Sequence, residues 1–197
     1  RQVALKIPRP EIWQDAERAL RFELEAKTVA KLDHPGIIPL YEAKLEGPTP
    51  YLVSAYCPGM DLSRWLQTHR DPIRWQDAAR FVARLADAVH FAHQQNIVHR
   101  DLKPSNVMLE FRDTDPQTVR SIANAQPRLG DFGLAKAHDL SLLDTRSSIV
   151  VGSIMYMAPE QLGGTPDETS SHAVDIYGLG CLLFELLTLS LIHISEP

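Results

Sequence analysis

The stretch His99-Arg-Asp-Leu-Lys-Pro-Ser-Asn106 decides the fold of this chain. It follows residues 75–89, whose apolar side chains recur at helical spacing and predict a long amphipathic helix. It precedes the apolar run Val107-Met-Leu109, and loops with short strands are expected over residues 96–160. Charged and amide side chains therefore lie in a loop directly after a helix.

The remaining segments predict further strands and helices. Short apolar runs bounded by proline or glycine predict strands over residues 3–7, 37–41 and 51–56. Helical spacing predicts helices over residues 11–32 and 174–188. The second of these helices is almost uniformly apolar, which predicts a buried helix. Strands with one helix, followed mostly by helices, indicate an α+β chain with two lobes.

The composition is that of an ordinary globular protein. The 197 residues are 44% hydrophobic and carry a formal net charge of −5, which excludes a disordered chain and argues against a nucleic-acid binder. Cys57 and Cys181 form no CxxC and no metal-ligand spacing, so we expect a reduced, cytoplasmic setting without a disulfide framework. The apolar stretch 179–192 contains Glu185 and is shorter than the roughly 20 residues a bilayer needs, so no membrane segment is expected here.

Three further motifs stand in a fixed order around the first stretch. Val3-Ala-Leu-Lys6 precedes it, and Asp131-Phe-Gly133 and Met157-Ala-Pro-Glu160 follow it. Together the four motifs resemble the protein kinase family, in the style of its bacterial, eukaryotic-like members. The resemblance implies the two-lobed α+β protein-kinase fold.

The implied fold is incomplete. A small lobe is expected over residues 1–56, without its first two strands and the Gly-rich loop, and a large lobe over residues 57–188, without its late helices. We interpret both gaps as truncation, and we expect the fragment alone to be inactive. Residues 189–197 match the translation of a sequencing-library adaptor, which indicates a non-native tail; an ordinary helix end followed by a loop is the alternative.

The resemblance implies specific catalytic roles. Phosphoryl transfer depends mostly on positioning and charge neutralisation. Asp101 would orient the substrate hydroxyl and accept its proton, and Lys103 would steady the transferring phosphate. Asn106 and Asp131 would supply oxygen ligands to Mg²⁺. The implied cofactors are therefore ATP and Mg²⁺.

The resemblance also implies a nucleotide site. Lys6 would neutralise the α and β phosphates of ATP and would pair with a helix glutamate. Glu25 is the matching residue because it falls in line with the apolar positions of helix 11–32, whereas the rival Glu23 faces another way. A buried Lys6–Glu25 pair is therefore expected.

The adenine base would bind at the strand 51–56 and its exit. Ser54 aligns with the gatekeeper position, and its small side chain would leave a deep back pocket open. Ala55, Tyr56 and Cys57 would form the hinge, which binds adenine through its backbone, and Asp61 would approach the ribose.

The substrate side of the site indicates a serine/threonine kinase. Lys103-Pro-Ser in the catalytic loop is similar to that class, whereas tyrosine kinases carry a different triplet. Ser153 would lie in the substrate-facing loop near Asp101. Thr145 and Ser147 are the expected phosphorylation sites of the activation loop, with Ser148 as a rival and ordinary loop solvation as the alternative.

The family implies structural roles for six further residues, which are His99, Arg100, Phe132, Gly133, Glu160 and Asp175. Arg100 would meet an activation-loop phosphate, and Asp175 would bind the backbone of residues 99–100. From Asp101 to Asp131 there are 30 positions, more than the family norm, and we place the extra length in a surface insertion over residues 111–128.

The expected function is transfer of the ATP γ-phosphate to Ser or Thr hydroxyls of protein substrates. Dimerisation for trans-autophosphorylation and a membrane anchor elsewhere in the full-length parent are further expectations. Two alternatives stay open: a nucleotide-binding scaffold of the pseudokinase type, and a small-molecule phosphotransferase. The metal and base residues argue against the first, and Lys103-Pro-Ser with the Ala158-Pro-Glu160 loop argues against the second.

Overall fold

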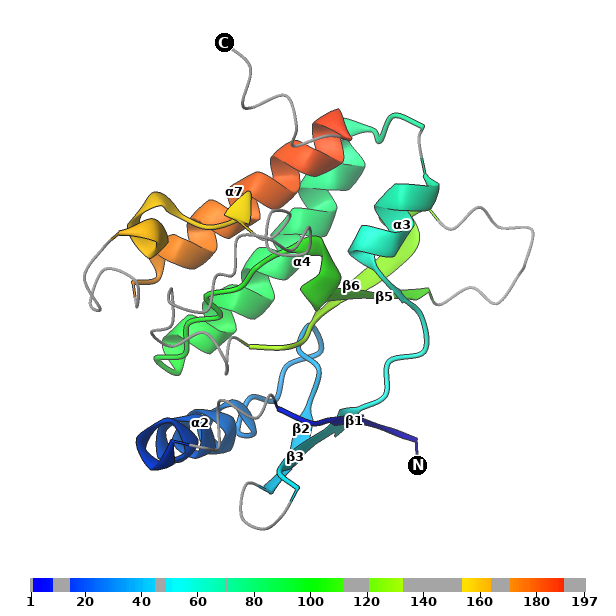
Figure 1. Cartoon of the computed structure of the whole chain (residues 1–197). Helices are drawn as coiled ribbons and strands as arrows, with labels where there is room; N and C mark the ends of the chain where they lie inside the picture. Colours follow the sequence, from blue (N-terminus) through cyan, green and yellow to red (C-terminus); the bar gives the residue numbers. More distant parts are fainter. Residues whose placement is uncertain are drawn as a thin grey trace.

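The N-terminal apolar run forms one edge of a three-stranded antiparallel sheet in the computed structural model, which describes residues 2–8, 15–44, 49–69, 71–111, 121–132, 154–163 and 171–189. β1 (Val3–Lys6) pairs with β3 (Tyr51–Ala55), which also pairs with β2 (Leu40–Lys44), so the strand order is β1-β3-β2. The register places Lys6 opposite Leu52. Helix α2 (Ala16–Val29) lies beside this sheet (Figure 1).

The stretch His99–Asn106, which is called the catalytic loop below, leads into a second antiparallel sheet. Its order is β4 (Met60–Asp61), β5 (Val107–Phe111) and β6 (Ala125–Leu129). The loop enters this sheet through a short 3-10 helix, η1 (Pro104–Asn106), and a second one, η2 (Ile122–Asn124), precedes β6. Asn106 is thereby fixed at the start of a buried strand.

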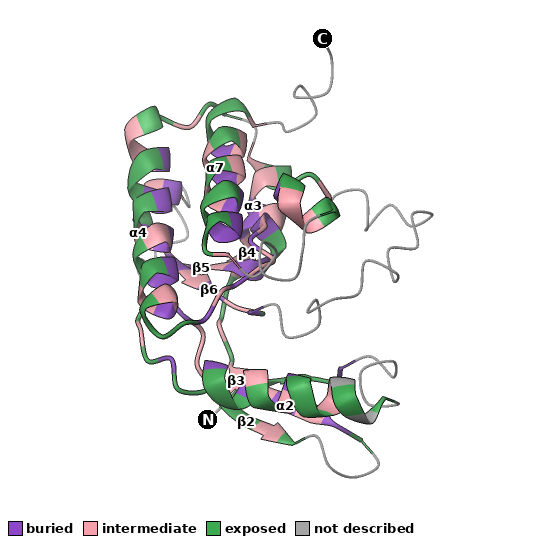
Figure 2. Cartoon of the chain, turned by 90° about the vertical axis from the view of Figure 1, so that its left-hand side faces the viewer, coloured by how far each residue is buried: buried purple, intermediate pink, exposed green. Residues whose placement is uncertain are grey.

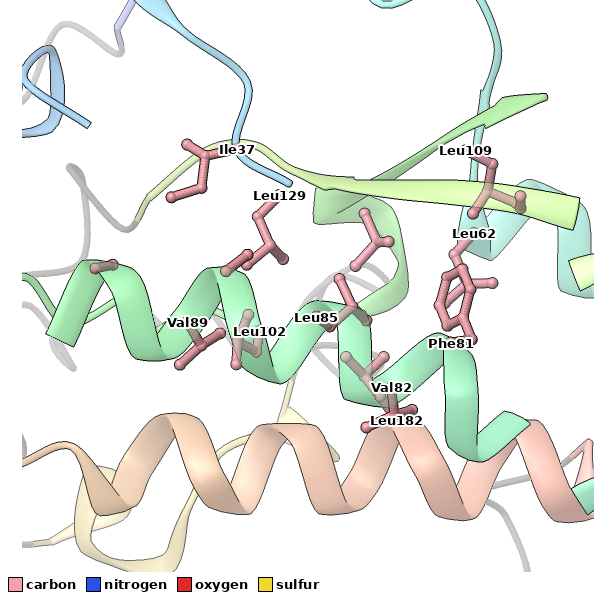
Figure 3. Packing of buried hydrophobic residues seen from close by; sticks show 14 of the residues in the cluster. Ile37, Leu62, Phe81, Val82, Leu85, Val89, Leu102, Leu109, Leu129 and Leu182 are labelled. Atoms are coloured by element: carbon pink, nitrogen blue, oxygen red, sulfur yellow. The ribbon is translucent and has the colours of Figure 1, made fainter. Parts of the chain in front are cut away.

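The main core lies between this second sheet and two long helices. The helices are α4 (Trp75–Gln94) and α7 (Ala173–Thr188), and a shorter helix, α3 (Leu62–Thr68), covers the other end of the sheet (Figure 1). Phe81 and Leu85 of α4 are fully buried, and Leu182 of α7 lies beside Val82 on the side of α4 that faces α7 (Figure 3). A separate small cluster joins Phe22 and Ala26 of α2 to Leu52.

Figure 2 shows two groups of elements: the first sheet with α2 lies below, and the second sheet with α3, α4 and α7 lies above. The segment between α2 and β2 connects the two groups. Ile37 pairs with Leu129 in an isolated parallel bridge, and it lies in the main core (Figure 3). Gly36 is required at this joint, because a Cβ there would lie 2.9 Å from the Cβ of Ala88 on α4. Ile37 therefore connects the first group of elements to the main core.

The predicted elements agree with the structure in type and differ at their ends. β2 starts at Leu40 rather than at residue 37, since Pro39 has no N–H for a ladder and Ile37 is used in the bridge to Leu129. Helix α2 starts at Ala16 and ends at Val29, while part of the predicted segment before it lies outside the described residues. Within the described part of the chain, no helix is both long and apolar enough to cross a membrane.

Two predictions need correction. The helix of residues 174–188 is buried on one face only, because Ile176, Tyr177, Phe184 and Leu187 on its other side are 40–65% exposed. The insertion does not extend over residues 111–128: Ile122 and Ala125 are buried, and β6 pairs with β5 along its whole length. The residues of this region outside the described part are 112–120.

Candidate active site

The catalytic-loop stretch brings a carboxylate, an ammonium group and an amide into contact. Lys103 Nζ lies 2.9 Å from Asp101 Oδ2. Asn106 Nδ2 donates both to the backbone carbonyl of Asp101 at 2.7 Å and to its Oδ2 at 3.0 Å. Because the amide nitrogen is used by Asp101, the atom that Asn106 would offer to a metal is its carbonyl oxygen. Asp101, Lys103 and Asn106 are therefore placed together, as the sequence predicts.

The backbone of this loop is held by a buried carboxylate of α7. Asp175, which is 1% exposed, accepts the N–H of His99 through Oδ2 and the N–H of Arg100 through Oδ1, each at 2.8 Å. The predicted contact of Asp175 with the backbone of residues 99–100 is thus present. His93 Nε2 donates to Asp175 Oδ2 at 2.7 Å. Burial alone would raise the pKa of Asp175, but the hydrogen bonds from His93 and from the backbone of His99 and Arg100 lower it.

The ring of His99 connects this loop to Gly130 and Phe132, on either side of Asp131. Its Nε2 lies 3.0 Å from the carbonyl oxygen of Gly130, which can only accept, so Nε2 carries the proton. Its Nδ1 then accepts the N–H of Asp101 at 3.3 Å. Burial lowers the pKa of His99, which favours this neutral form. The ring also contacts Phe132, with centroids 4.6 Å apart.

Lys6 and Asp131 form an ion pair in the lining of a cavity. Lys6 Nζ lies 2.7 Å from Asp131 Oδ1, and both side chains are about half exposed (55% and 54%). The backbone of Asp131 has a φ of 53°, in the left-handed region that non-glycine residues seldom occupy. The next residue, Phe132, is buried and anchors this turn.

The cavity measures about 340 Å³ and lies between the two sheets. Predicted site residues contribute eight of its lining positions, namely Lys6, Ser54, Ala55, Tyr56, Cys57, Asn106, Asp131 and Phe132. The N–H of Ala55 donates to the carbonyl of Pro39 at 2.9 Å, so this residue would offer a ligand its carbonyl. Burial raises the pKa of the Cys57 thiol.

The predicted Lys6–Glu25 pair is wrong for this structure. Lys6 pairs with Asp131, and Glu25 Oε1 lies 3.4 Å from Arg100 Nη1. Glu25 is also only half-buried, because α2 carries it towards the catalytic loop, where a guanidinium is available. A second cavity of about 250 Å³ is lined by Glu25, Arg100 and Phe132.

Other predicted residues lie away from the first cavity. The Asp61 side chain accepts the N–H of Arg64 at 2.8 Å and caps α3, and Asp61 does not line the cavity expected to hold the ribose. Glu160 lies in the 3-10 helix η4 (Pro159–Leu162). Four predicted residues fall outside the described part of the chain: Gly133, Thr145, Ser147 and Ser153.

Sequence reasoning missed two groups of residues. The cavity has an apolar lining that includes Ala4, Leu40, Leu52 and Met108. Alternation along the strands would have shown which of these positions share a face, but not that this face borders a cavity. His93 and Gln161 were also missed, since nothing local in their sequence shows the long-range bonds they make.

Comparison with known proteins places this geometry among protein kinases. The family model described as "Protein kinase domain" matches residues 1–195. Serine/threonine-protein kinase PknB of Mycobacterium leprae is 38% identical over 95% of the chain, and PrkC of Bacillus subtilis is 36% identical over 95%. The chain spans only 28% and 26% of the lengths of these two relatives.

Solved structures share the fold. The PknI kinase domain of Mycobacterium tuberculosis superposes with a TM-score of 0.66 at 24% identity, over 94% of this chain and 63% of that one. Rad53 residues 1–466 in complex with AMP-PNP gives a TM-score of 0.67 at 25% identity, over 95% of this chain and 41% of that one. The incomplete two-lobed α+β fold expected from the motifs is confirmed.

Proposed function

The chain belongs to the protein kinase domain family, and from this premise we propose that it transfers the γ-phosphoryl group of ATP to serine or threonine hydroxyls of proteins. The curated relatives at 36–38% identity are serine/threonine-protein kinases, which supports this acceptor class. The described residues include the loop and the cavity that such a reaction needs.

The observation that carries the proposal is the position of Asp101. Its carboxylate is held by Lys103 and Asn106, and Asn106 also lines the cavity that contains Lys6 and Asp131. A base beside a cationic and oxygen-rich pocket suits transfer of a phosphoryl group from a nucleotide to a hydroxyl. A plain binding site would not require the Lys103–Asp101 contact.

Each residue has a proposed role in the transfer. Asp101 orients the acceptor hydroxyl and takes its proton, and Lys103 stabilises charge on the transferring group. Lys6 binds the phosphates of the nucleotide, so its ammonium group leaves Asp131 when the nucleotide enters. The hinge, residues 55–57, binds the adenine base beside the gatekeeper Ser54.

The donor set fits Mg²⁺. The Asn106 carbonyl and the Asp131 carboxylate are hard oxygen ligands at the edge of the cavity, and Mg²⁺ prefers one or two carboxylates together with phosphate oxygens. The bound ion would neutralise charge on the β and γ phosphates. Lys6 occupies Oδ1 of Asp131, so movement of Lys6 to the phosphates would free this oxygen for the ion.

Substrate binding and regulation extend the proposal beyond the described residues. Ser153 is proposed to face the acceptor, and Thr145 and Ser147 to be phosphorylated, by a second copy in trans. The domain would act in the cytoplasm, with residues 1–56 and 57–188 as its lobes.

The acceptor class decides between this function and its alternatives. The intact gene product is incubated with Mg²⁺ and [γ-³²P]ATP and offered a generic protein substrate, its own chain, and a panel of aminoglycosides and choline. Label in Ser or Thr of protein, lost in Asp101→Asn and kept in the exposed control Asp71→Asn, supports the kinase. Label only in small molecules supports a small-molecule phosphotransferase, and nucleotide binding without any transfer supports a scaffold.

A further inference from the structure

The side-chain amide of Gln161 joins η4 to the catalytic loop. Its Oε1 accepts the backbone N–H of Ala158 at 2.9 Å, and its Nε2 donates to the backbone carbonyl of Arg100 at 2.9 Å. The reversed amide would place two donors together at Ala158 and two acceptors together at Arg100, so only this orientation satisfies both partners. The oxygen and the nitrogen of this one amide therefore bond to two different segments of the chain.

Only the first of these bonds has a local explanation. A glutamine at the third position of a helix that reaches back to the N-cap N–H is half of a capping box, and glutamate serves there equally well. The bond to Arg100 spans 61 positions and needs a hydrogen-bond donor. An ionised glutamate has none, so the choice of glutamine matters for the second bond and not for the first.

Arg100 sits in a conformation that needs support. Its φ is 61°, in the left-handed region, which a non-glycine residue keeps only when its surroundings enforce it. Its N–H donates to Asp175 Oδ1, and its carbonyl accepts from Gln161 Nε2. Side chains from two later segments therefore hold both polar backbone groups of the residue that precedes Asp101.

We propose that Gln161 is a positioning residue for phosphoryl transfer, because its bond to the Arg100 carbonyl fixes the peptide that carries Asp101. The inference rests on the proposed function, in which Asp101 is the base. The segment that contains Gln161 is itself anchored, since the Tyr156 hydroxyl donates to Glu185 Oε2 of α7 at 2.6 Å. Residues 154–163 are thus tied both to α7 and to the catalytic loop.

Gln161→Glu separates this role from helix capping. In the intact gene product at pH 8 we expect kcat to fall about tenfold, the size of one lost hydrogen bond, with KM for ATP unchanged. As the pH falls towards 5, about one sixth of a carboxylate with the ordinary glutamate pKa of about 4.3 is protonated and can donate again, so the ratio of variant to wild-type kcat rises about two- to threefold. Gln161→Ala loses the donor permanently, and its ratio stays constant with pH.

The matched control is Gln95→Glu, which makes the same charge change at the exposed end of α4 and should leave kcat unchanged. A flat pH ratio for Gln161→Glu, or a loss expressed only in KM, would overturn the inference. The test depends on how the kcat ratio of Gln161→Glu changes with pH, and a general folding defect would not restore kcat as the pH falls.

Amide hydrogen exchange tests the same hydrogen bond without an activity measurement. At pH 8, Gln161→Glu should speed exchange of the Arg100 and Asp101 amides and leave Ala158 protected, since the cap is kept. If the wild type transfers no phosphate, the proposed function fails while this measurement still decides the role of Gln161. Wild-type exchange at Arg100 and Asp101 in the variant would contradict the proposed contact.

Discussion

The loop that carries Asp101 and the Lys6–Asp131 ion pair in the first cavity are held in opposite ways. The loop is fixed by buried hydrogen bonds to Asp175, which is 1% exposed, whereas Lys6 and Asp131 form a pair that is about half exposed. Breaking a buried pair is costly, and exposed pairs contribute little to stability. The difference indicates a rigid loop around Asp101 and a Lys6–Asp131 pair that can exchange its partners.

The largest effect on stability is expected at Asp175, the buried carboxylate that holds the loop. Asp175→Ala leaves the N–H groups of His99 and Arg100 and the ring of His93 without their acceptor. We expect the free energy of unfolding to fall by about 3–5 kcal/mol. Urea denaturation checks this, with Asp71→Ala as an exposed control; equal midpoints for the two variants would contradict the account.

The second-largest effect on stability is expected at Gly36, where the segment between α2 and β2 packs against α4. In Gly36→Ala the new methyl group would lie 2.9 Å from Ala88 Cβ, so either the loop or α4 must shift. Overpacking of this kind costs about 1–3 kcal/mol. Gly163→Ala, which meets no atom within 4 Å, is the matched control, and thermal unfolding of both variants measures the difference.

The pH dependence of stability sharpens the comparison. The pKa of Asp175 is lowered in the fold, so its contribution is present above its unfolded pKa of about 3.9 and is lost as the pH falls through the lower folded value. The stability difference between wild type and Asp175→Asn should therefore be large at pH 6 and should shrink towards pH 2–3. Urea titrations at both pH values measure it, and a constant difference would argue against a charged Asp175.

The smallest effect on stability is expected at the exposed pair. Lys6→Met should change the free energy of unfolding by less than about 1 kcal/mol. Its affinity for Mg²⁺–ATP should nevertheless fall about 10- to 100-fold, since a charge-assisted contact to phosphate is lost. Calorimetric titration beside a denaturation curve separates the two effects; a destabilised protein with normal nucleotide affinity would reverse the interpretation.

The sequence predicted the catalytic loop well because its contacts are local or tied to strong motifs. Asp101, Lys103 and Asn106 lie within one short segment, and the helix before it has clear periodicity. The types of the long elements followed from apolar spacing in the same way. Ser54 and the residues expected to form the hinge, 55–57, also line the cavity.

Contacts between residues that are distant in sequence could not be predicted in this way. Helical spacing places Glu25 on the inner side of α2, but it does not determine which cation that side meets, and Arg100 is the partner. Nor does spacing show that Gln161 reaches Arg100, or that the apolar sequence of α7 leaves one face exposed. Each of these depends on how elements distant in sequence are set against one another.

The position of Asp101 is the central claim, and a single-turnover assay tests it most directly. The intact gene product and its Asp101→Asn variant are mixed with Mg²⁺ and [γ-³²P]ATP, and transfer to a protein acceptor is followed beside nucleotide affinity. The account predicts that transfer falls by about 10²- to 10⁴-fold, as expected for loss of a general base, with nucleotide affinity unchanged. Equal rates of transfer in the two proteins would contradict it.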